Sequence, residues 1–169
     1  MKKLTNIKLG KLDIKYAKKV WDDTYDYNWK SSVISWMDES ISRSIYHNNK
    51  VIGVYVLGDG TINEFVGYCG DESMPKPWVD NKCILSDDIK QYENKKGIHG
   101  LHIYVDKEYR GKGIGRKLME YSESLGDYTW GQQGVELNNL HHWKKRRTHI
   151  GEFYKNDKLM GHITITKLK

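Results

Sequence analysis

The sequence has only two cysteines and two prolines among its 169 residues, and it has no long apolar run. Cys69 and Cys83 form neither a CxxC pair nor a disulfide framework, which favours two thiols in a reducing compartment. No stretch approaches the roughly 18 apolar residues that a membrane-spanning helix needs. The start, MKKLTNIKLGKL, lacks the apolar core and the small-residue cleavage site of a signal peptide. We therefore expect a cytoplasmic protein.

The composition is that of a soluble globular chain, with 38% hydrophobic and 30% charged residues. At this length we expect a single domain over residues 1–169 that can bury a real core. The net charge of +6 favours anionic partners such as nucleotides, nucleic acids or acidic proteins, without choosing among them. Nothing in the sequence predicts metal ligands.

Hydrophobic periodicity and turn residues divide the chain into strands and helices. We expect strands at 4–9, 43–47, 50–57, 99–106 and 128–131, and in a final hairpin that turns at Asn156-Asp157. We expect helices within 12–21, 31–40, 86–97, 114–125 and 137–147. This order predicts a mixed α/β architecture. Residues 58–98 hold both prolines and are interpreted as an elaborated loop and helix insert over a binding face.

The glycines and cations of residues 110–115, Arg-Gly-Lys-Gly-Ile-Gly, follow a strand and precede a helix. The P-loop pattern fails there, because the spacing is wrong and no Ser or Thr follows the lysine. The dinucleotide fingerprint fails as well, because Arg116 stands where its last glycine is required. The pattern [RQ]xxGx[GA] matches.

This segment has the physical properties of an anion site. Gly113 and Gly115 let the backbone approach a ligand closely, and the amides that follow lie at the positive end of a helix. Four cations could neutralise a pyrophosphate: Arg110, Lys112, Arg116 and Lys117. The alternative is a glycine-rich turn with solvated cations.

The order strand, [RQ]xxGx[GA], helix resembles the acyl-CoA-binding signature of the GNAT superfamily of N-acyltransferases, to which YRGKGIGRKLME is a close match. The resemblance implies a central mixed, mostly antiparallel sheet flanked by helices, with splayed central strands. It also implies acetyl-CoA as substrate, CoA as product, and transfer of an acetyl group to a primary amine by direct attack. The residues that it implies in acetyl-CoA binding are Ile103, Tyr104, Val105, Arg110, Gly111, Lys112, Gly113, Ile114, Gly115, Arg116, Asn138 and Asn139.

Acetyl transfer to an amine needs a base, and a proton donor helps the leaving thiolate. Many family members place a glutamate near the start of the motif strand, where this chain has His99. A structural role for His99 is the alternative, and His102 faces the other way. Glu64 and Asp59 are further base candidates.

The tyrosine that commonly serves as the acid in the family is absent, since Trp143 and Lys144 stand at the corresponding place. Tyr154, His141 or His142 could replace it, or water could protonate the thiolate.

The segment DDTYDYNW, between the first two helices, is the candidate acceptor region. Carboxylates interleaved with aromatic rings attract and orient a cationic amine, such as a lysine side chain, an N-terminus or a polyamine. The substrate-binding candidates are Asp22, Asp26, Tyr27 and Trp29. A solvated acidic helix end is the alternative. Tyr68 and Trp78 of the insert could form part of a lid over the acceptor.

Two other classes of function stay open from the sequence. One is an acyl-CoA-binding module without turnover, which the missing tyrosine would permit. The other is a protein that binds nucleic acid or an acidic partner through the cations of residues 144–147. Those cations could also bind the 3′-phosphate of CoA or form a solvated helix end. Many family members dimerise, so the resemblance allows a homodimer.

Overall fold

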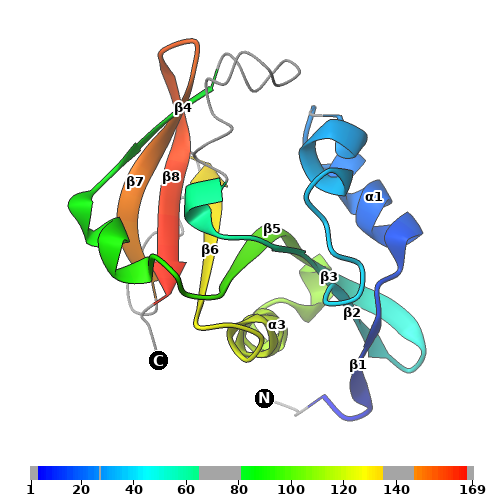
Figure 1. The fold of residues 1–169 in the computed structure, drawn as a ribbon. Helices are drawn as coiled ribbons and strands as arrows, with labels where there is room; N and C mark the ends of the chain where they lie inside the picture. The colour runs from blue at the N-terminus through cyan, green and yellow to red at the C-terminus, as the bar shows by residue number, and fades with distance from the viewer. Residues whose placement is uncertain (1–3, 27, 65–80, 135–146, 167–169) are drawn as a thin grey trace. The chain divides into compact units, whose positions relative to one another are not determined.

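The computed structural model describes residues 4–26, 28–64, 81–134 and 147–166. Its strands are β1 Ile7–Lys11, β2 Arg43–His47, β3 Lys50–Asp59, β4 Asn81–Leu85, β5 Gly97–Val105, β6 Tyr128–Gly134, β7 Arg147–Lys155 and β8 Lys158–Thr166. Its helices are α1 Ile14–Asp22 and α3 Ile114–Glu123, with the short helices η1 Lys30–Ile34, η3 Asp87–Tyr92 and η4 Lys107–Tyr109 (Figure 1).

The strands form a mixed eight-stranded sheet in the order β1-β2-β3-β5-β6-β8-β7-β4. Strands β5 and β6 pair in parallel, whereas β1–β2, β2–β3, β4–β7, β6–β8 and β7–β8 are antiparallel. The predicted class, a mixed and mostly antiparallel sheet with flanking helices, is confirmed. The β5–β6 pairing runs from Gly97 opposite Tyr128 to His99 opposite Trp130. The splay expected beyond this point stays a prediction.

The chain divides into two compact units. The first unit comprises Met1–Asp59 and Gly100–Leu125, and the second comprises Gly60–His99 and Gly126–Lys169. Strand β5 begins in the second unit and ends in the first. The single domain expected over residues 1–169 stays a prediction.

The core of the first unit lies around β3, which is buried at every position from Ile52 to Gly58. Successive side chains of a strand point to opposite faces, so continuous burial means that both faces of β3 are covered. Both α1 and α3 contact β3. The cluster that includes the buried side of α1 consists of Leu12, Ala17, Val20, Trp21, Trp29, Val33, Val54 and Val56.

Two predicted hairpins form at the expected turns. Asn48 and Asn49, between β2 and β3, have φ values of 50° and 64°. Asn156 and Asp157, between β7 and β8, have φ values of 49° and 60°. Two consecutive residues with positive φ are the requirement of a type I′ turn, whose twist matches that of the strands, and Asn and Asp tolerate this conformation.

The second helix is shorter than the sequence predicts. Residues 31–40 were expected to be helical, but η1 is a π-helix that ends at Ile34. The chain then turns, and the Asp38 amide donates a hydrogen bond of 2.8 Å to the Leu57 carbonyl of β3. At Asp38, a hydrogen bond to β3 therefore replaces the backbone hydrogen bond that a longer helix would form.

The insert at residues 58–98 contains a strand that the sequence analysis missed. Strand β4 pairs with β7, from Asn81 opposite Lys155 to Leu85 opposite Gly151. The short helix expected at residues 86–97 is present as the 3₁₀-helix η3, and the Ser86 hydroxyl caps it by accepting from the Asp88 amide at 3.3 Å. Residues 65–80 lie outside the described residues, and so do the two lid candidates Tyr68 and Trp78.

A polar network lies inside the second unit, next to the buried side chains of β6 and β8. Arg147 donates hydrogen bonds to Thr129 Oγ1 at 2.8 Å and to Thr164 Oγ1 at 3.3 Å. Arg147 was expected to lie at the end of a helix over residues 137–147, where its charge could be solvated. It is instead the first residue of β7 and is buried. Residues 144–146 lie outside the described residues.

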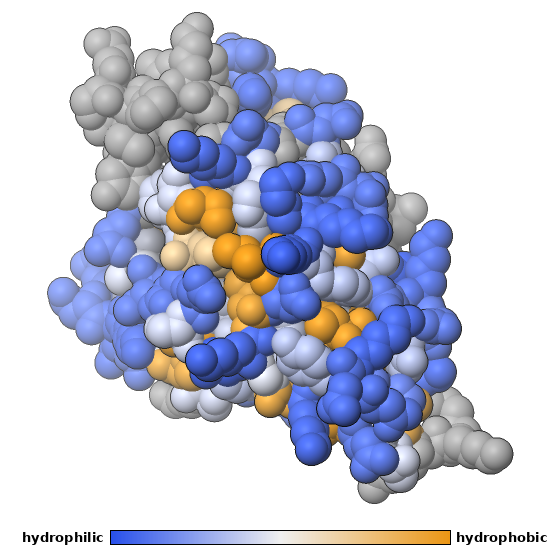
Figure 2. Space-filling model, turned by 90° about the vertical axis from the view of Figure 1, so that its right-hand side faces the viewer, coloured by the Kyte–Doolittle hydropathy of each residue, from blue (hydrophilic) through white to orange (hydrophobic). Residues whose placement is uncertain are grey.

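Hydrophilic residues cover most of the face seen in Figure 2, with smaller hydrophobic areas between them. Within the described ranges, no helix is both long enough and apolar enough to cross a membrane.

Ser42→Ala is expected to destabilise the protein by about 1–3 kcal/mol. The buried Ser42 hydroxyl accepts from the Leu57 amide at 2.9 Å and donates to the Asp38 carbonyl at 2.8 Å. Alanine leaves that amide without this acceptor inside the core. Urea denaturation measures the loss, with Ser40→Ala as control, because the exposed Ser40 hydroxyl contacts only the Asp38 carboxylate in the described structure. Equal effects of the two variants would contradict the assignment.

Candidate functional site

The segment between β5 and α3 is built to expose its backbone. After β5 ends at Val105, the short helix η4 leads into a turn in which Gly111 and Gly113 have φ values of 74° and 82°. Both values lie in the left-handed region that glycine adopts without the steric cost of a side chain. Gly113 is the N-cap residue of α3. The chain therefore reverses within a few residues and presents the N-terminus of α3.

The amides at that N-terminus are available to an anion. The Lys117 amide donates to the Gly113 carbonyl at 3.1 Å. The amides of Ile114, Gly115 and Arg116 precede it and so have no acceptor within the helix. The Arg110 amide, another residue that the resemblance implies in acetyl-CoA binding, donates to the Lys107 carbonyl of η4 at 3.2 Å. This amide is therefore already paired within the protein.

Gly115 differs from the two glycines before it. Its φ is not positive, so the backbone conformation alone does not require glycine. A Cβ added at Gly115 would meet no atom within 4 Å in the described structure. Glycine inside a helix costs about 0.5–1 kcal/mol relative to alanine. Neither strain nor packing within the described residues accounts for this glycine.

Two cationic side chains of the loop, those of Arg110 and Lys112, donate hydrogen bonds to nearby backbone carbonyls. Arg110 Nε donates to the Val105 carbonyl at 2.8 Å, and the guanidinium lies 5.5 Å from the Tyr104 ring centroid. Lys112 Nζ donates to the Glu108 carbonyl at 2.7 Å. Both side chains are exposed, and so is Arg116. Positive charge therefore gathers around the free amides, and the arrangement can hold a phosphate or pyrophosphate.

Residues 45–156 match the family model described as the acetyltransferase (GNAT) domain. The chain belongs to this family. As a member of it, this GNAT protein is an acetyl-CoA-dependent N-acetyltransferase. The match includes the loop at residues 110–115, on which the resemblance in sequence was based.

Solved structures share the fold at low identity. The NatC complex bound to Gag peptide and CoA aligns at 15% identity with a TM-score of 0.60, covering 98% of this chain and 100% of the matched chain. Arabidopsis thaliana Naa50, in complex with the bisubstrate analogue CoA-Ac-MVNAL, aligns at 12% identity with a TM-score of 0.58, covering 97% and 100%. Arabidopsis thaliana NAA60, in complex with acetyl-CoA, aligns at 15% identity with a TM-score of 0.58, covering 96% and 99%. No curated protein matches the GNAT chain.

His99, the first base candidate, is buried in the second unit. Its ring stacks on Trp130, with a centroid distance of 3.7 Å and an interplanar angle of 8°. Burial, together with the charge of Arg147, lowers the pKa of His99 to about 3. The imidazole is therefore neutral at physiological pH. A pKa this low disfavours the imidazolium that a base would form, so this environment suits a packing role, and the role as base stays a prediction.

His102 is also buried, in the first unit. Its ring lies 5.2 Å from Trp21 and 5.8 Å from Tyr25, both in edge-on geometry. Burial lowers the pKa of His102 to about 4. Among the described residues, no hydrogen-bond partner reaches its Nε2 atom. His102 is thus a neutral ring within an aromatic cluster.

Glu64 has a local structural explanation. Its carboxylate accepts from the Thr61 amide at 2.8 Å, and the Thr61 hydroxyl accepts from the Glu64 amide at 3.2 Å. This reciprocal pair is a capping box at the start of a helical turn. The pattern T-x-x-E was visible in the sequence and accounts for Glu64 without catalysis.

Tyr154, the acid candidate, lies on β7 of the second unit and is partly buried. Its hydroxyl donates to the Glu152 carboxylate, and this hydrogen bond is the main cause that raises the pKa of Tyr154. Glu152 was not among the predicted residues. Its spacing of two residues from Tyr154 in the predicted hairpin was the available signal, because such residues share one face of a strand.

The candidate acceptor segment in the first unit is only partly exposed. Trp29 is buried in the core, where its ring lies 5.8 Å from that of Trp21. Asp22 forms an exposed ion pair with Lys18 one helical turn earlier. Asp26 is exposed, and Tyr27 lies outside the described residues. Trp29 is therefore a core residue, and its part in acceptor binding stays a prediction.

Two further predicted cofactor residues, Asn138 and Asn139, lie outside the described residues, as do His141 and His142. Within the first unit, the structure brings together Tyr104, Val105 and Arg110 through the guanidinium contacts given above. The three catalytic candidates all belong to the second unit.

Proposed function

We propose that this enzyme transfers the acetyl group of acetyl-CoA directly to a primary amine, without a covalent enzyme intermediate. The observation that carries the proposal is the loop before α3, where amides without a helical acceptor and exposed cations lie beside Gly115, whose Cβ position meets no atom of the described residues within 4 Å. Acetyl-CoA supplies an activated thioester, so the protein has to bind, orient and move protons, and needs no nucleophile of its own.

The pyrophosphate of acetyl-CoA is assigned to the amides of Ile114, Gly115 and Arg116. Gly111 and Gly113 set the turn that exposes these amides, and the macrodipole of α3 favours the negative charge. Arg110 and Lys112 neutralise it further. The end of β5, from Ile103 to Val105, is partly exposed and is assigned to the pantetheine arm, through its backbone.

The acceptor is proposed to be a cationic amine, and a peptide amine is the first class to test. Asp26 and Tyr25 remain exposed in the acidic segment after α1, with 38% of Tyr25 accessible, and can attract such a group. The NatC and Naa50 structures contain a peptide and a CoA–peptide analogue respectively, which guides the choice of probes.

Tyr154→Phe is expected to lower kcat by about 100-fold with little change in KM, if Tyr154 protonates the leaving thiolate. Phenylalanine keeps the ring and removes only the hydroxyl that donates to Glu152. Steady-state kinetics with a peptide amine measures the effect. His99→Gln and Glu64→Gln test the two base candidates under the same conditions. An unchanged kcat in Tyr154→Phe would remove this residue from the mechanism.

The experiment that tests the function measures thiol release from acetyl-CoA against a panel of peptide N-termini, lysine peptides and polyamines. Acetylation of the amine, confirmed by mass spectrometry, is the expected result. Tight acetyl-CoA binding with no turnover on any amine would instead support a CoA-binding module. Steep salt-dependent retention on DNA or RNA, without acetyl-CoA binding, would support the nucleic-acid alternative.

A further inference from the structure

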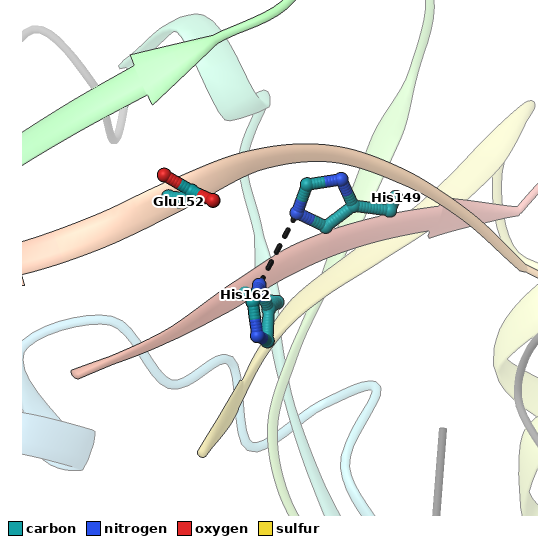
Figure 3. Close-up of side chains that lie close together, drawn as sticks. All are labelled: His149, Glu152 and His162. Carbon is teal, nitrogen blue, oxygen red and sulfur yellow. Dashed lines mark hydrogen bonds between the residues drawn. The ribbon is translucent and has the colours of Figure 1, made fainter. Parts of the chain in front are cut away.

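Three potential ligand side chains meet on the β7–β8 hairpin of the second unit, away from the proposed CoA loop in sequence. His149 and Glu152 lie on β7, and His162 lies on β8 (Figure 3). One ligand atom from each residue lies within 4.8 Å of the others. The proposed acetyl transfer uses none of these three residues as a base, acid or anchor for acetyl-CoA.

A β-bulge brings the first two residues to the same face. In a regular strand, residues three apart point to opposite faces. The ladder shifts after His149, which opposes Thr164, so that Gly151 opposes Ile163 and Glu152 opposes His162. The one extra residue in β7, Ile150, restores a common face for His149 and Glu152. His162 lies directly across from Glu152.

The bulge is fixed by its surroundings. Ile150 is buried, which anchors the extra residue in the core. A Cβ on Gly151 would lie 2.4 Å from the Ile84 carbonyl oxygen of β4, so only glycine fits against that strand. The position of the three side chains is therefore set by the sheet and does not depend on a loop.

The distances suit a small divalent cation. His149 Nε2 and His162 Nδ1 are 3.3 Å apart. Two nitrogens bound tetrahedrally to Zn²⁺ at about 2.0–2.1 Å are about 3.3–3.4 Å from each other. A carboxylate oxygen of Glu152 lies within 4.8 Å of both nitrogens. One of its oxygens already accepts from the Tyr154 hydroxyl, an outer hydrogen bond of the kind that orients metal-binding carboxylates.

The chemistry of the donors selects the metal. Two imidazoles and one carboxylate suit Zn²⁺ and related transition metals, whereas Mg²⁺ and Ca²⁺ prefer sets made only of oxygen ligands. His149 is exposed, and Glu152 and His162 are partly exposed, so a cation can enter from solvent. Three protein ligands leave one tetrahedral position for water or for a donor atom of another molecule.

We propose that His149, Glu152 and His162 form a Zn²⁺-binding site. The competing explanation is a hydrogen bond between the two imidazoles with no metal. The proposal does not depend on the acetyltransferase reaction, since binding of Zn²⁺ can be measured without acetyl-CoA.

Zinc titration of the full-length chain, without a histidine tag and after removal of metals, tests the site. We expect one Zn²⁺ per chain by calorimetry, and visible absorption bands of tetrahedral geometry when Co²⁺ replaces Zn²⁺. His149→Ala should weaken Zn²⁺ binding by at least about 100-fold, as should His162→Ala. Glu152→Gln should weaken it and alter the Co²⁺ bands. The matched control is His47→Ala, because His47 lies in the first unit beside Tyr109 and should leave binding unchanged.

Two outcomes would overturn the site. One is no Zn²⁺ binding by the wild-type chain, which would leave the imidazole hydrogen bond as the explanation. The other is Zn²⁺ binding that persists in His149→Ala or falls equally in His47→Ala. Because His149 is exposed, its replacement should not unfold the chain, so that variant remains informative even if His162→Ala proves unstable.

Discussion

Gly115→Glu is expected to weaken acetyl-CoA binding by at least about 100-fold while leaving the protein folded. The side chain enters the open space in front of the α3 amides, and its charge repels the pyrophosphate. The same charge in the first turn of a helix is favourable to folding by about 0.3–1 kcal/mol. Loss of binding in a stable variant would therefore not reflect unfolding.

A series at the same position separates size from charge. Gly115→Ala should raise the melting temperature, since alanine is favoured over glycine in a helix by about 0.5–1 kcal/mol, and should weaken binding less than glutamate does. Gly115→Gln should lie between them in affinity. Titration calorimetry with acetyl-CoA and thermal unfolding give both quantities. Wild-type affinity in all three variants would show that no ligand approaches this residue.

The stability of the fold should fall steeply in mild acid, with a slope that approaches about 2.7 kcal/mol per pH unit near pH 5. Burial lowers the pKa values of His99 and His102 from 6.5 to about 3 and about 4. In this window the unfolded chain binds a proton at each imidazole and the folded chain does not. Acid therefore favours the unfolded state, and the stabilisation is complete only above the unfolded pKa.

Urea denaturation at a series of pH values measures this slope. His99→Gln and His102→Gln each remove one titrating ring, so each should reduce the slope by about half, to about 1.4 kcal/mol per pH unit. Glutamine keeps a polar side chain without a proton to gain in this range. A slope that is unchanged in both variants would mean that these imidazoles are not the source of acid sensitivity.

Local patterns in the sequence predicted the parts of the fold that local physics determines. The Asn48-Asn49 and Asn156-Asp157 turns tolerate positive φ, and the stripe of apolar residues along α3 follows helical periodicity. The loop at residues 110–115 is similarly local, since both its glycines and its cations are adjacent in sequence. These features were predicted with nearly the observed limits.

Features that depend on distant contacts were missed. Strand β4 is a five-residue edge strand whose assignment depends on pairing with β7, about 70 residues later. The early end of η1 depends on the bond from Asp38 to Leu57 in β3. Trp29 was predicted to bind the acceptor because acidic and aromatic residues interleave around it, and the sequence did not show that its ring packs against Trp21 in the core.

The three residues of the proposed zinc site show the same limit. His149 and Glu152 are three residues apart, a spacing that places side chains on opposite faces of a regular strand. Only the bulge at Ile150, anchored against β4, brings them together. A sequence pattern does not reveal a bulge that depends on a neighbouring strand. No metal ligands were therefore expected there.

Amide hydrogen exchange, measured with and without acetyl-CoA, tests the central claim most directly. We expect acetyl-CoA to slow exchange at Ile114, Gly115 and Arg116, whose amides have no acceptor within α3. Gly115→Glu should abolish this protection. Protection of other segments by acetyl-CoA, with unchanged exchange at these three amides, would contradict the assignment of the loop as the pyrophosphate site.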